Sequence, residues 1–138
     1  MNYWLAKTEP DVFSYSDLES LGKDDWGGVK NFAALKHMRS MKPGDRVFIY
    51  HTGKERSVVG VAEVIGEYYP DRKEDDPRWI TIDLKPLYPF NRPVTLKEVK
   101  SHPEFFSGEL VTQSRLSVMP VPTEIWKAIH KLGETLEK

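Results

Sequence analysis

The pattern of apolar residues predicts five β-strands in this chain. Residues 46–52 are apolar on both faces, so this strand is expected at the centre of a sheet. Residues 57–65 follow after a short turn, which predicts antiparallel pairing, and Gly60 within them indicates a bend or bulge. The predicted strands are residues 2–8, 46–52, 57–65, 79–84 and 116–120.

The stretch 79–84 alternates cleanly between apolar and polar residues. Its apolar positions are expected to face the core, and its polar positions, with the residue that follows, to face solvent. Prolines then interrupt the pattern and predict the end of the strand. The inward set is Ile80, Ile82 and Leu84, the outward set is Thr81, Asp83 and Lys85, and the prolines are Pro86, Pro89 and Pro93.

A spacing of three residues between apolar side chains predicts a helix that begins near Phe32. Phe32, Leu35 and Met38 form the apolar stripe, while Lys36 and Arg39 fall on the opposite side. Pro43-Gly44-Asp45 then turns the chain.

Three further helices have start signals or an apolar side. A serine or threonine followed three residues later by glutamate forms a capping box, in which each residue hydrogen-bonds to the other's backbone N–H. Such boxes stand at Ser16–Glu19, before a short helix that should end near Gly22, and at Thr95–Glu98. A closing helix is expected from Thr123, with Ile125, Trp126 and Ile129 on its apolar side.

The order of these elements is strand, helix, helix, three strands, helix, strand, helix, which is an α+β layout. Strands of this number and length tend to curl, so we expect a small mixed β-barrel with helices in the connections. An open sheet with helices on one face is the alternative. A length of 138 residues predicts a single domain over residues 1–138.

Composition excludes several classes of function. The chain has no cysteine, which excludes disulfides and thiolate metal sites. It has no secretory leader pattern and no membrane-length apolar run, so the expected location is the cytoplasm, or the nucleus of a eukaryote. No phosphate-binding glycine loop, nucleophile elbow or zinc motif occurs, so no cofactor, metal or catalytic constellation is expected.

Charge is unevenly distributed although the net charge is only −1. No acidic residue lies between Asp25 and Asp45, while four basic residues do, and acidic residues gather in 67–76. A local basic surface of this kind can attract phosphate. The alternative is one solvated helix face beside one acidic loop. The basic residues are Lys30, Lys36, Arg39 and Lys42.

The segment Trp26–Asn31 is the best candidate for a binding site. A large aromatic ring precedes two glycines, then come a lysine and an asparagine, which together suit a flat, anionic ligand. Acidic and glycine neighbours predict that Trp26 is partly exposed, although it could simply anchor the loop. The other three tryptophans, Trp4, Trp79 and Trp126, lie in apolar patterns and are expected in the core.

Four scattered histidines carry little sign of chemistry. His51 stands out because it ends the predicted central strand, where functional side chains often lie. Packing or capping at that position is the alternative.

Several of these pieces together resemble the EVE domain family. The matching stretches occur in the family's order and span nearly the whole chain. The family belongs to the PUA-like superfamily of small mixed β-barrels, and a more distant resemblance is to the YTH readers of methylated adenine. The stretches are residues 3–10, 26–32, 38–39, 44–45, 50–51, 60–64, 115–118 and 120–121.

The resemblance implies a binding module, not an enzyme, that recognises a modified base, cytosine or adenine, in DNA or RNA. Trp26 would form a wall of the base pocket, and Lys7 and Thr8 would line its mouth or meet phosphate. Asn31, which has both donors and an acceptor, would read a base edge. The further candidates are Gly28, Val29 and Lys30 in the pocket segment, Tyr50, His51, Arg115 and Ser117 at the rim, and Lys36 and Arg39 at phosphate.

This chain departs from the family after Phe32. Many members carry Gln-Ala-Arg-Asn where residues 33–36 here are Ala-Ala-Leu-Lys, so an arginine contact is missing and the ligand could differ. Two other functions stay open: a small enzyme acting on RNA or a nucleobase, with His51 or Lys7 as general acid or base, and a binder of a free nucleotide-like molecule. The partner expected is nucleic acid, with no membrane, and the oligomeric state is left open.

Overall fold

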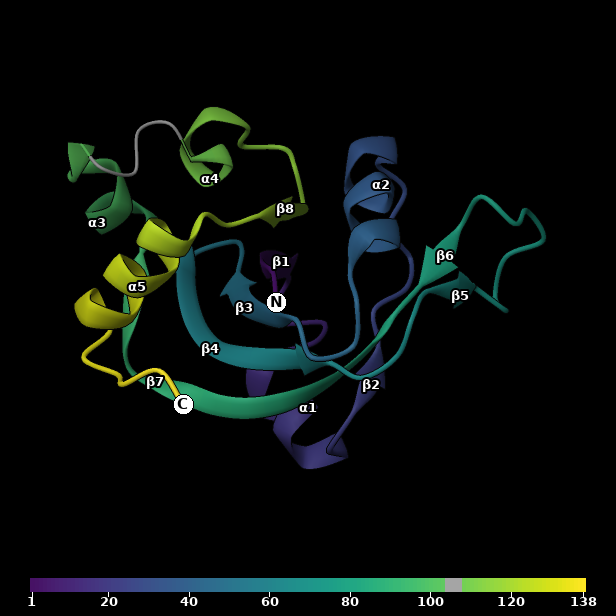
Figure 1. The fold of residues 1–138 in the computed structure, drawn as a ribbon, viewed down its shortest axis with the longest axis horizontal. Coiled ribbons are helices and arrows are strands. Elements are labelled where there is room, and N and C mark those ends of the chain that lie inside the picture. The colour runs from purple at the N-terminus through teal and green to yellow at the C-terminus, as the bar shows by residue number, and fades with distance from the viewer. Residues whose placement is uncertain (104–107) are drawn as a thin grey trace.

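A computed structural model describes residues 1–103 and 108–138 of the chain. A six-stranded mixed sheet, in the order β2-β7-β4-β3-β1-β8, curls into a half-barrel, and a separate hairpin (β5 and β6) projects from one end (Figure 1). The elements are β1 (Tyr3–Thr8), α1 (Tyr15–Leu21), β2 (Asp24–Asp25), α2 (Phe32–Ser40), β3 (Arg46–His51), β4 (Ser57–Val64), β5 (Tyr69–Pro70), β6 (Ile80–Thr81), β7 (Asp83–Thr95), α3 (Leu96–Lys100), α4 (Glu109–Thr112), β8 (Val118–Pro120) and α5 (Thr123–Leu132).

Strand β3 lies at the centre of the sheet, as its apolar pattern predicts. It pairs with β1 in parallel and with β4 in the antiparallel direction that the short turn predicts. Strand β8 pairs antiparallel with β1, on the other side from β3. The α+β class and the curled mixed sheet are therefore confirmed.

Gly60 produces the expected irregularity in β4. The registers of β4 with both β3 and β7 shift beside this residue. A Cβ atom at Gly60 would lie 2.7 Å from the ring of Tyr15, so the glycine lets α1 pack its buried tyrosine directly on the strand. The Tyr15 hydroxyl then donates to the backbone oxygen of Val61 at 2.7 Å.

The expectation that prolines end the strand near Leu84 is wrong. Strand β7 runs for 13 residues, through all three prolines. It pairs with β2 only at Asp83 and Leu84, so within the described chain its outer edge has no strand partner beyond that point. Proline lacks an N–H donor, and an edge or a bulge does not require one.

Thr81 is also not on the solvent side as alternation predicted. It is buried, and its hydroxyl donates to the Asp25 carboxylate at 3.3 Å. Thr81 belongs to β6, and its hydroxyl lies close to Gly27 in the segment that follows β2. That segment covers the side of β6 that alternation assigned to solvent.

Helix starts follow the sequence signals with one shift. Helix α3 begins with the expected capping box of Thr95 and Glu98. Helix α1 instead uses Ser14 as its N-cap, in a box with Asp17, two residues before the predicted one, and it ends at Gly22 as expected. Strand β2, the β5–β6 pairing and helix α4 had no sequence prediction.

Aromatic rings fill the core between the sheet and α5. Phe48 stacks on Trp126 with ring centroids 3.9 Å apart, and Tyr3 stacks on Trp126 at 4.4 Å. Trp4 and Trp126 are buried as predicted, whereas Trp79 is only half-buried. Figure 1 shows α3 and α5 at the end of the sheet away from α2 and the hairpin. Among the described residues, no helix has the length and apolar character needed to cross a membrane.

Candidate functional site

An open cleft of about 660 Å³ lies where β1 ends, and three separate parts of the chain line it. Lys7 and Thr8 come from the end of β1, the segment Trp26–Lys30 comes from the β2–α2 connection, and Ser117 precedes β8. We call this space the Trp26 cleft. The other lining residues are Glu9, Val12, Phe13, Asp24, Asp25 and Lys73.

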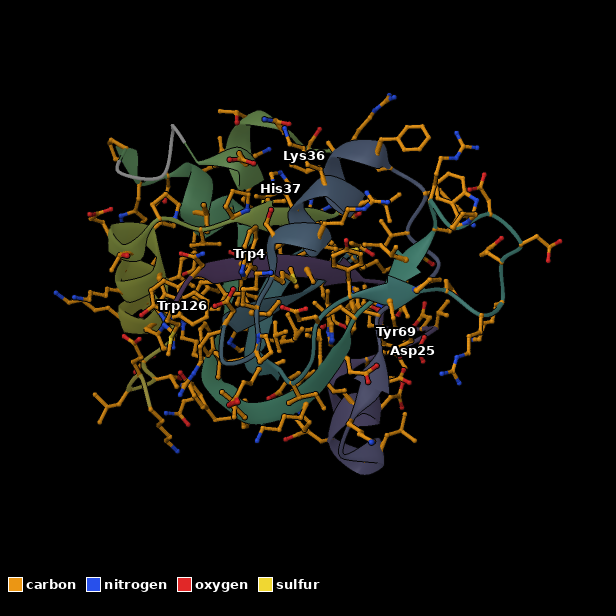
Figure 2. All side chains as sticks on the ribbon, turned by 45° about the vertical axis from the view of Figure 1, so that its right-hand side comes forward. Trp4, Asp25, Lys36, His37, Tyr69 and Trp126 are labelled. Carbon is orange, nitrogen blue, oxygen red and sulfur yellow. The ribbon has the colours of Figure 1, made fainter. Side chains whose placement is uncertain are left out.

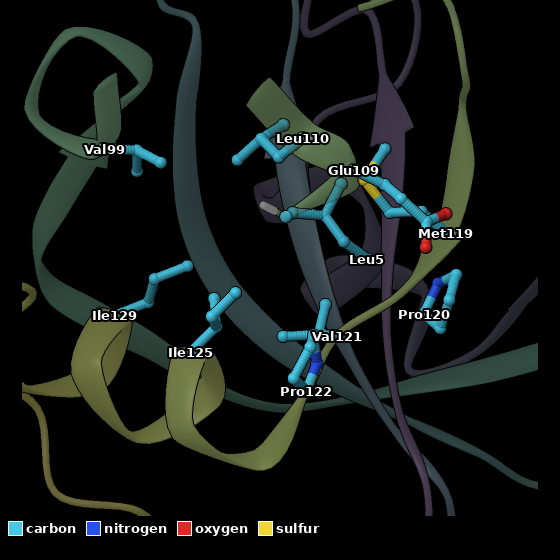
Figure 3. A pocket seen from close by; sticks show the side chains of 11 residues that line it. Leu5, Val99, Glu109, Leu110, Met119, Pro120, Val121, Pro122, Ile125 and Ile129 are labelled. Atoms are coloured by element: carbon cyan, nitrogen blue, oxygen red, sulfur yellow. The ribbon is translucent and has the colours of Figure 1, made fainter. Parts of the chain in front are cut away.

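A second cavity is too small to hold a base. It lies between α5, α4 and β8, is apolar and measures about 20 Å³, which is room for roughly one water molecule (Figure 3). It is therefore a packing void of the core.

Trp26 is more buried than predicted, with 9% of its surface exposed. Its backbone N–H donates to the oxygen of Ile82 at 2.8 Å, and the ring of Phe13 meets its ring edge to face at 6.0 Å between centroids. The loop before α1 therefore covers one side of the indole. Trp26 anchors its loop and at the same time lines the cleft.

The two glycines after Trp26 fit closely against Asp71. A Cβ atom at Gly27 would lie 2.7 Å from a carboxylate oxygen of Asp71 and 3.2 Å from the hydroxyl of Thr81. Gly28 has a φ of +76°, and its N–H donates to the Asp71 carboxylate at 3.2 Å. Both glycines are therefore needed for this approach of backbone to side chain.

The acidic stretch 67–76 contacts the segment that holds Gly28 and Lys30. It includes β5 and much of the loop of the β5–β6 hairpin. Hydrogen bonds from the backbone N–H of Lys73 and then of Gly28 lower the pKa of Asp71, so this buried carboxylate stays ionised. Glu74 pairs with Lys30 at 2.5 Å.

Lys7 lines the cleft and lies over an aromatic ring. Its Nζ atom donates to the backbone oxygen of Ser114 at 3.0 Å and lies 5.5 Å from the centroid of the Tyr50 ring. Burial lowers the pKa of Lys7. An ammonium group has three donors, so Lys7 can also contact an anion in the cleft. The hydroxyl of Thr8 already donates its hydrogen to the backbone oxygen of Phe13 at 2.6 Å, so it is left only as an acceptor for a ligand.

Carboxylates line the side of the cleft beside β2. Burial, followed by the nearby Asp25 charge, raises the pKa of Asp24. Figure 2 shows Asp25 close to Tyr69, whose hydroxyl donates to Asp83 at 2.6 Å. That hydrogen bond, with burial, raises the pKa of Tyr69 to about 12. The cleft therefore presents both cations and hydrogen-bond acceptors.

Asn31, Lys36 and Arg39 are not among the residues that line the Trp26 cleft as described. The Asn31 side chain accepts from the backbone N–H of Ala34 at 3.0 Å and so caps α2, which leaves its NH₂ group for another partner. Arg39 donates to the backbone oxygen of Arg78 at 2.9 Å, and Lys36 is exposed.

Three predicted rim residues do not line the cleft as the described chain forms it. Tyr50 is buried beneath Lys7. His51 is also buried: one ring nitrogen accepts from the backbone N–H of Tyr15 at 3.0 Å and the other lies 2.9 Å from a Glu55 carboxylate oxygen. His51 thus fixes the start of α1, in line with the packing alternative. Arg115 is exposed in the connection between α4 and β8.

Sequence patterns missed several residues of the site. Phe13 and Val12 reach the cleft from the loop before α1, and Lys73 reaches it from the hairpin. Asp71 carried only the signal of a charged loop. Within the described ranges, no group of three histidine, aspartate or glutamate side chains could hold a metal ion.

Known proteins match the chain over nearly its whole length. Mouse thymocyte nuclear protein 1 is 33% identical over 97% of this chain and 74% of its own. An NMR structure of a protein from Rhodopseudomonas palustris is 41% identical, with a TM-score of 0.93, and covers 100% of this chain and 97% of its own.

One similar structure contains DNA. Human THYN1 protein, in complex with DNA that contains 5-methylcytosine, is 27% identical to this chain, with a TM-score of 0.90. The match covers 99% of this chain and 100% of the human one. The family model of the EVE domain matches residues 2–132, and the chain therefore belongs to the EVE domain family.

Proposed function

We propose that this protein binds nucleic acid carrying a modified cytosine and that the Trp26 cleft holds the modified base. The observation that carries this proposal is the meeting of Lys7, Trp26 and Ser117 in one cleft, from three distant parts of the chain. The similarity to human THYN1 protein, whose structure contains 5-methylcytosine DNA, supports it.

The dimensions and walls of the cleft suit a single extruded base. Its volume falls within the roughly 300–1,000 Å³ of small-ligand sites. Extruding a base from a duplex costs a few kcal/mol, which contacts with the indole of Trp26 and hydrogen bonds to the base edge can offset. A methyl group on the base adds apolar contact worth about 1–3 kcal/mol in a fitted pocket.

The polar groups of the cleft suit an amino-bearing base on a phosphate chain. The carboxylates of Asp24 and Asp25 can accept from an exocyclic amino group, which cytosine and adenine carry and thymine lacks. Lys7 supplies a cation for phosphate at the mouth. We assign the NH₂ group of Asn31 to the base edge or the neighbouring phosphate.

The same geometry supports binding without catalysis. The two acid–base candidates already have structural partners: His51 holds α1, and Lys7 contacts the backbone at Ser114. A DNA ligand would place the protein in the nucleus, or in the cytoplasm of a cell without one.

Fluorescence anisotropy with labelled DNA tests the proposal. Single-stranded and duplex oligonucleotides that carry one 5-methylcytosine should bind at least about tenfold more tightly than unmodified ones. Trp26→Phe should reduce this ratio, and Lys7→Met should weaken binding to both. Lys127→Met removes an exposed lysine from α5, at the other end of the sheet, and serves as the matched control.

Several outcomes would overturn the proposal. Equal affinity for modified and unmodified DNA, or discrimination that survives Trp26→Phe in a protein with unchanged unfolding, would exclude base recognition in this cleft. Tighter binding of RNA, or of N6-methyladenine, would reassign the ligand. Saturable binding of 5-methyldeoxycytidine monophosphate alone would favour a free nucleotide, and DNA or RNA turnover lost in His51→Ala would favour an enzyme.

A further inference from the structure

Phe32 is exposed although its spacing placed it in the apolar stripe of α2. The buried residues of α2 are Ala34, Leu35 and Met38, and 61% of the Phe32 surface is exposed. Its ring stacks on that of Trp79, with centroids 5.5 Å apart and planes only 13° from parallel. We call this pair the Phe32–Trp79 platform.

Backbone hydrogen bonds within the hairpin segment hold Trp79, one of the two rings of the platform. The backbone N–H of Trp79 donates to the oxygen of Asp76 at 3.1 Å, and its own backbone oxygen accepts from Asp71 at 2.8 Å. Asp71 is the residue that holds Gly28 in the Trp26 cleft. Asp71 therefore helps to position both the glycine segment of the cleft and the Trp79 ring of the platform.

Cations surround the two rings. Lys30 lies 4.5 Å from the Trp79 centroid, and the Arg78 guanidinium lies 5.9 Å from that of Phe32 and 5.7 Å from that of Trp79. Glu74 and Asp76 pair with Lys30 and Arg78 respectively, so part of this charge is neutralised. Two more cations, Lys36 and Arg39, follow Phe32 on helix α2.

The platform continues the Trp26 cleft, because Lys30 belongs to both. It lines the cleft and lies over Trp79. A chain whose base occupies the cleft would thus pass next to a second flat, cation-edged aromatic surface. Stacking on aromatic rings combined with a basic surface is how proteins bind single-stranded nucleic acid without regard to sequence.

We propose that the Phe32–Trp79 platform stacks an unpaired nucleobase next to the modified one, with Lys36 and Arg39 at the adjoining phosphates. This inference rests on the proposed function, since it takes the same nucleic acid as ligand. The platform supplies affinity, and the cleft supplies recognition of the modification. Every base has a flat aromatic face, so the second contact does not depend on sequence or on the modification.

Phe32→Ala separates the two roles. It should lower the affinity for a single-stranded oligonucleotide with one 5-methylcytosine by about tenfold and lower the affinity for the unmodified strand equally. The ratio between the two strands should stay at the wild-type value. Phe32→Tyr keeps a ring of similar size and should retain most of the affinity.

Leu21→Ala is the matched control. Leu21 lies on α1, is 60% exposed and does not line the cleft as described, so its truncation removes a similar exposed apolar side chain elsewhere. Its affinity for both strands should equal that of the wild-type protein. Thermal unfolding of each variant checks that the fold is kept.

The outcomes distinguish this inference from the proposed function. If Phe32→Ala keeps both the wild-type affinity and the wild-type ratio between modified and unmodified strands, the platform is overturned and the cleft proposal stands. If the wild-type protein binds the modified and unmodified strands equally, but Phe32→Ala lowers the affinity for both about tenfold, the platform is supported and recognition of the modified base is overturned. A loss equal to that in Leu21→Ala, or a change in the ratio alone, also overturns the platform.

Discussion

The backbone N–H of Gly28 donates a hydrogen bond to the buried carboxylate of Asp71 at 3.2 Å, across 43 positions of sequence. Asp71 is only 4% exposed and lies against Gly27 as well. The contact ties the β5–β6 hairpin to the glycine segment of the Trp26 cleft. The shape of the cleft therefore depends on a residue that no local pattern marked.

Asp71→Asn should lower the stability of the protein near neutral pH. The substitution removes the charge that the backbone N–H groups of Lys73 and Gly28 favour, and hydrogen bonds to charged groups are worth about 1.5–3 kcal/mol. The neutral amide also offers one acceptor in place of two. Urea unfolding measures the difference, with Asp75→Asn in the same loop as the control.

The pH dependence of that difference has a defined sign. The pKa of Asp71 is lowered in the folded protein, so its contribution is complete above the ordinary value of about 3.9. It should be lost as the pH falls below that value and through the lowered pKa of the folded state. Wild type and Asp71→Asn should therefore converge in stability in acid. A constant difference across this range would contradict the assignment.

Gly27→Ala and Gly28→Ala should each lower the stability of the protein, but for different reasons. An alanine at Gly28 meets no atom within 4 Å, but φ is +76°, so the expected cost is about 1–2 kcal/mol of backbone strain. An alanine at Gly27 drives its methyl group into the Asp71 carboxylate and the Thr81 hydroxyl. It should therefore also move the hairpin and weaken DNA binding.

A double variant tests the Gly27 contact. Gly27→Ala combined with Asp71→Ala should cost less free energy of unfolding than the sum of the two single changes, because the clash disappears. Additivity within error would show that the Gly27 methyl group is accommodated without moving Asp71.

Local sequence signals predicted most of the fold but could not place the first residue of every helix. The stretch 14–19 contains two overlapping capping boxes, Ser14–Asp17 and Ser16–Glu19, and local chemistry alone does not choose between them. The choice is made by Tyr15, which must enter the space that Gly60 leaves in β4. Contacts between distant segments decide what short-range patterns leave open.

The site was predictable in part for the same reason. Lys7, Trp26 and Ser117 were marked by their family resemblance and do line one cleft. The ring of Phe13 covers part of Trp26, and Phe32 stays largely exposed while its ring stacks on Trp79 of the hairpin segment. Neither relationship has a periodic signal in the sequence, because both arise from packing between elements.

His51→Ala should act on stability and not on recognition. It leaves the N–H of Tyr15 without its acceptor at a buried helix start, which costs about 1–3 kcal/mol. DNA affinity of the folded variant should match wild type within about twofold, since His51 does not line the cleft as described. His51→Gln, which keeps an acceptor, should recover part of the stability. A selective loss of DNA binding would return His51 to the site.

Gly60→Ala should disturb the packing of α1 on the sheet. The new methyl group would lie 2.7–2.9 Å from three ring atoms of Tyr15, and overpacking of this kind costs about 1–3 kcal/mol. In a Tyr15→Leu background the same glycine change should cost less. The coupling free energy from urea unfolding of the four proteins measures the contact, and a value near zero would contradict it.

Lys7→Met and Lys7→Arg should differ in the salt dependence of DNA binding. Each phosphate contact made by a cation adds about one to the slope of log affinity against log salt concentration, so Lys7→Met should reduce that slope by about one. Lys7→Arg keeps the charge and should keep the slope, even if its larger head group weakens binding over the Tyr50 ring. Burial lowers the pKa of Lys7, so wild-type affinity should fall at a lower alkaline pH than that of Lys7→Arg. An unchanged slope in Lys7→Met would place Lys7 in the structural support of Ser114 and remove it from the phosphate contact.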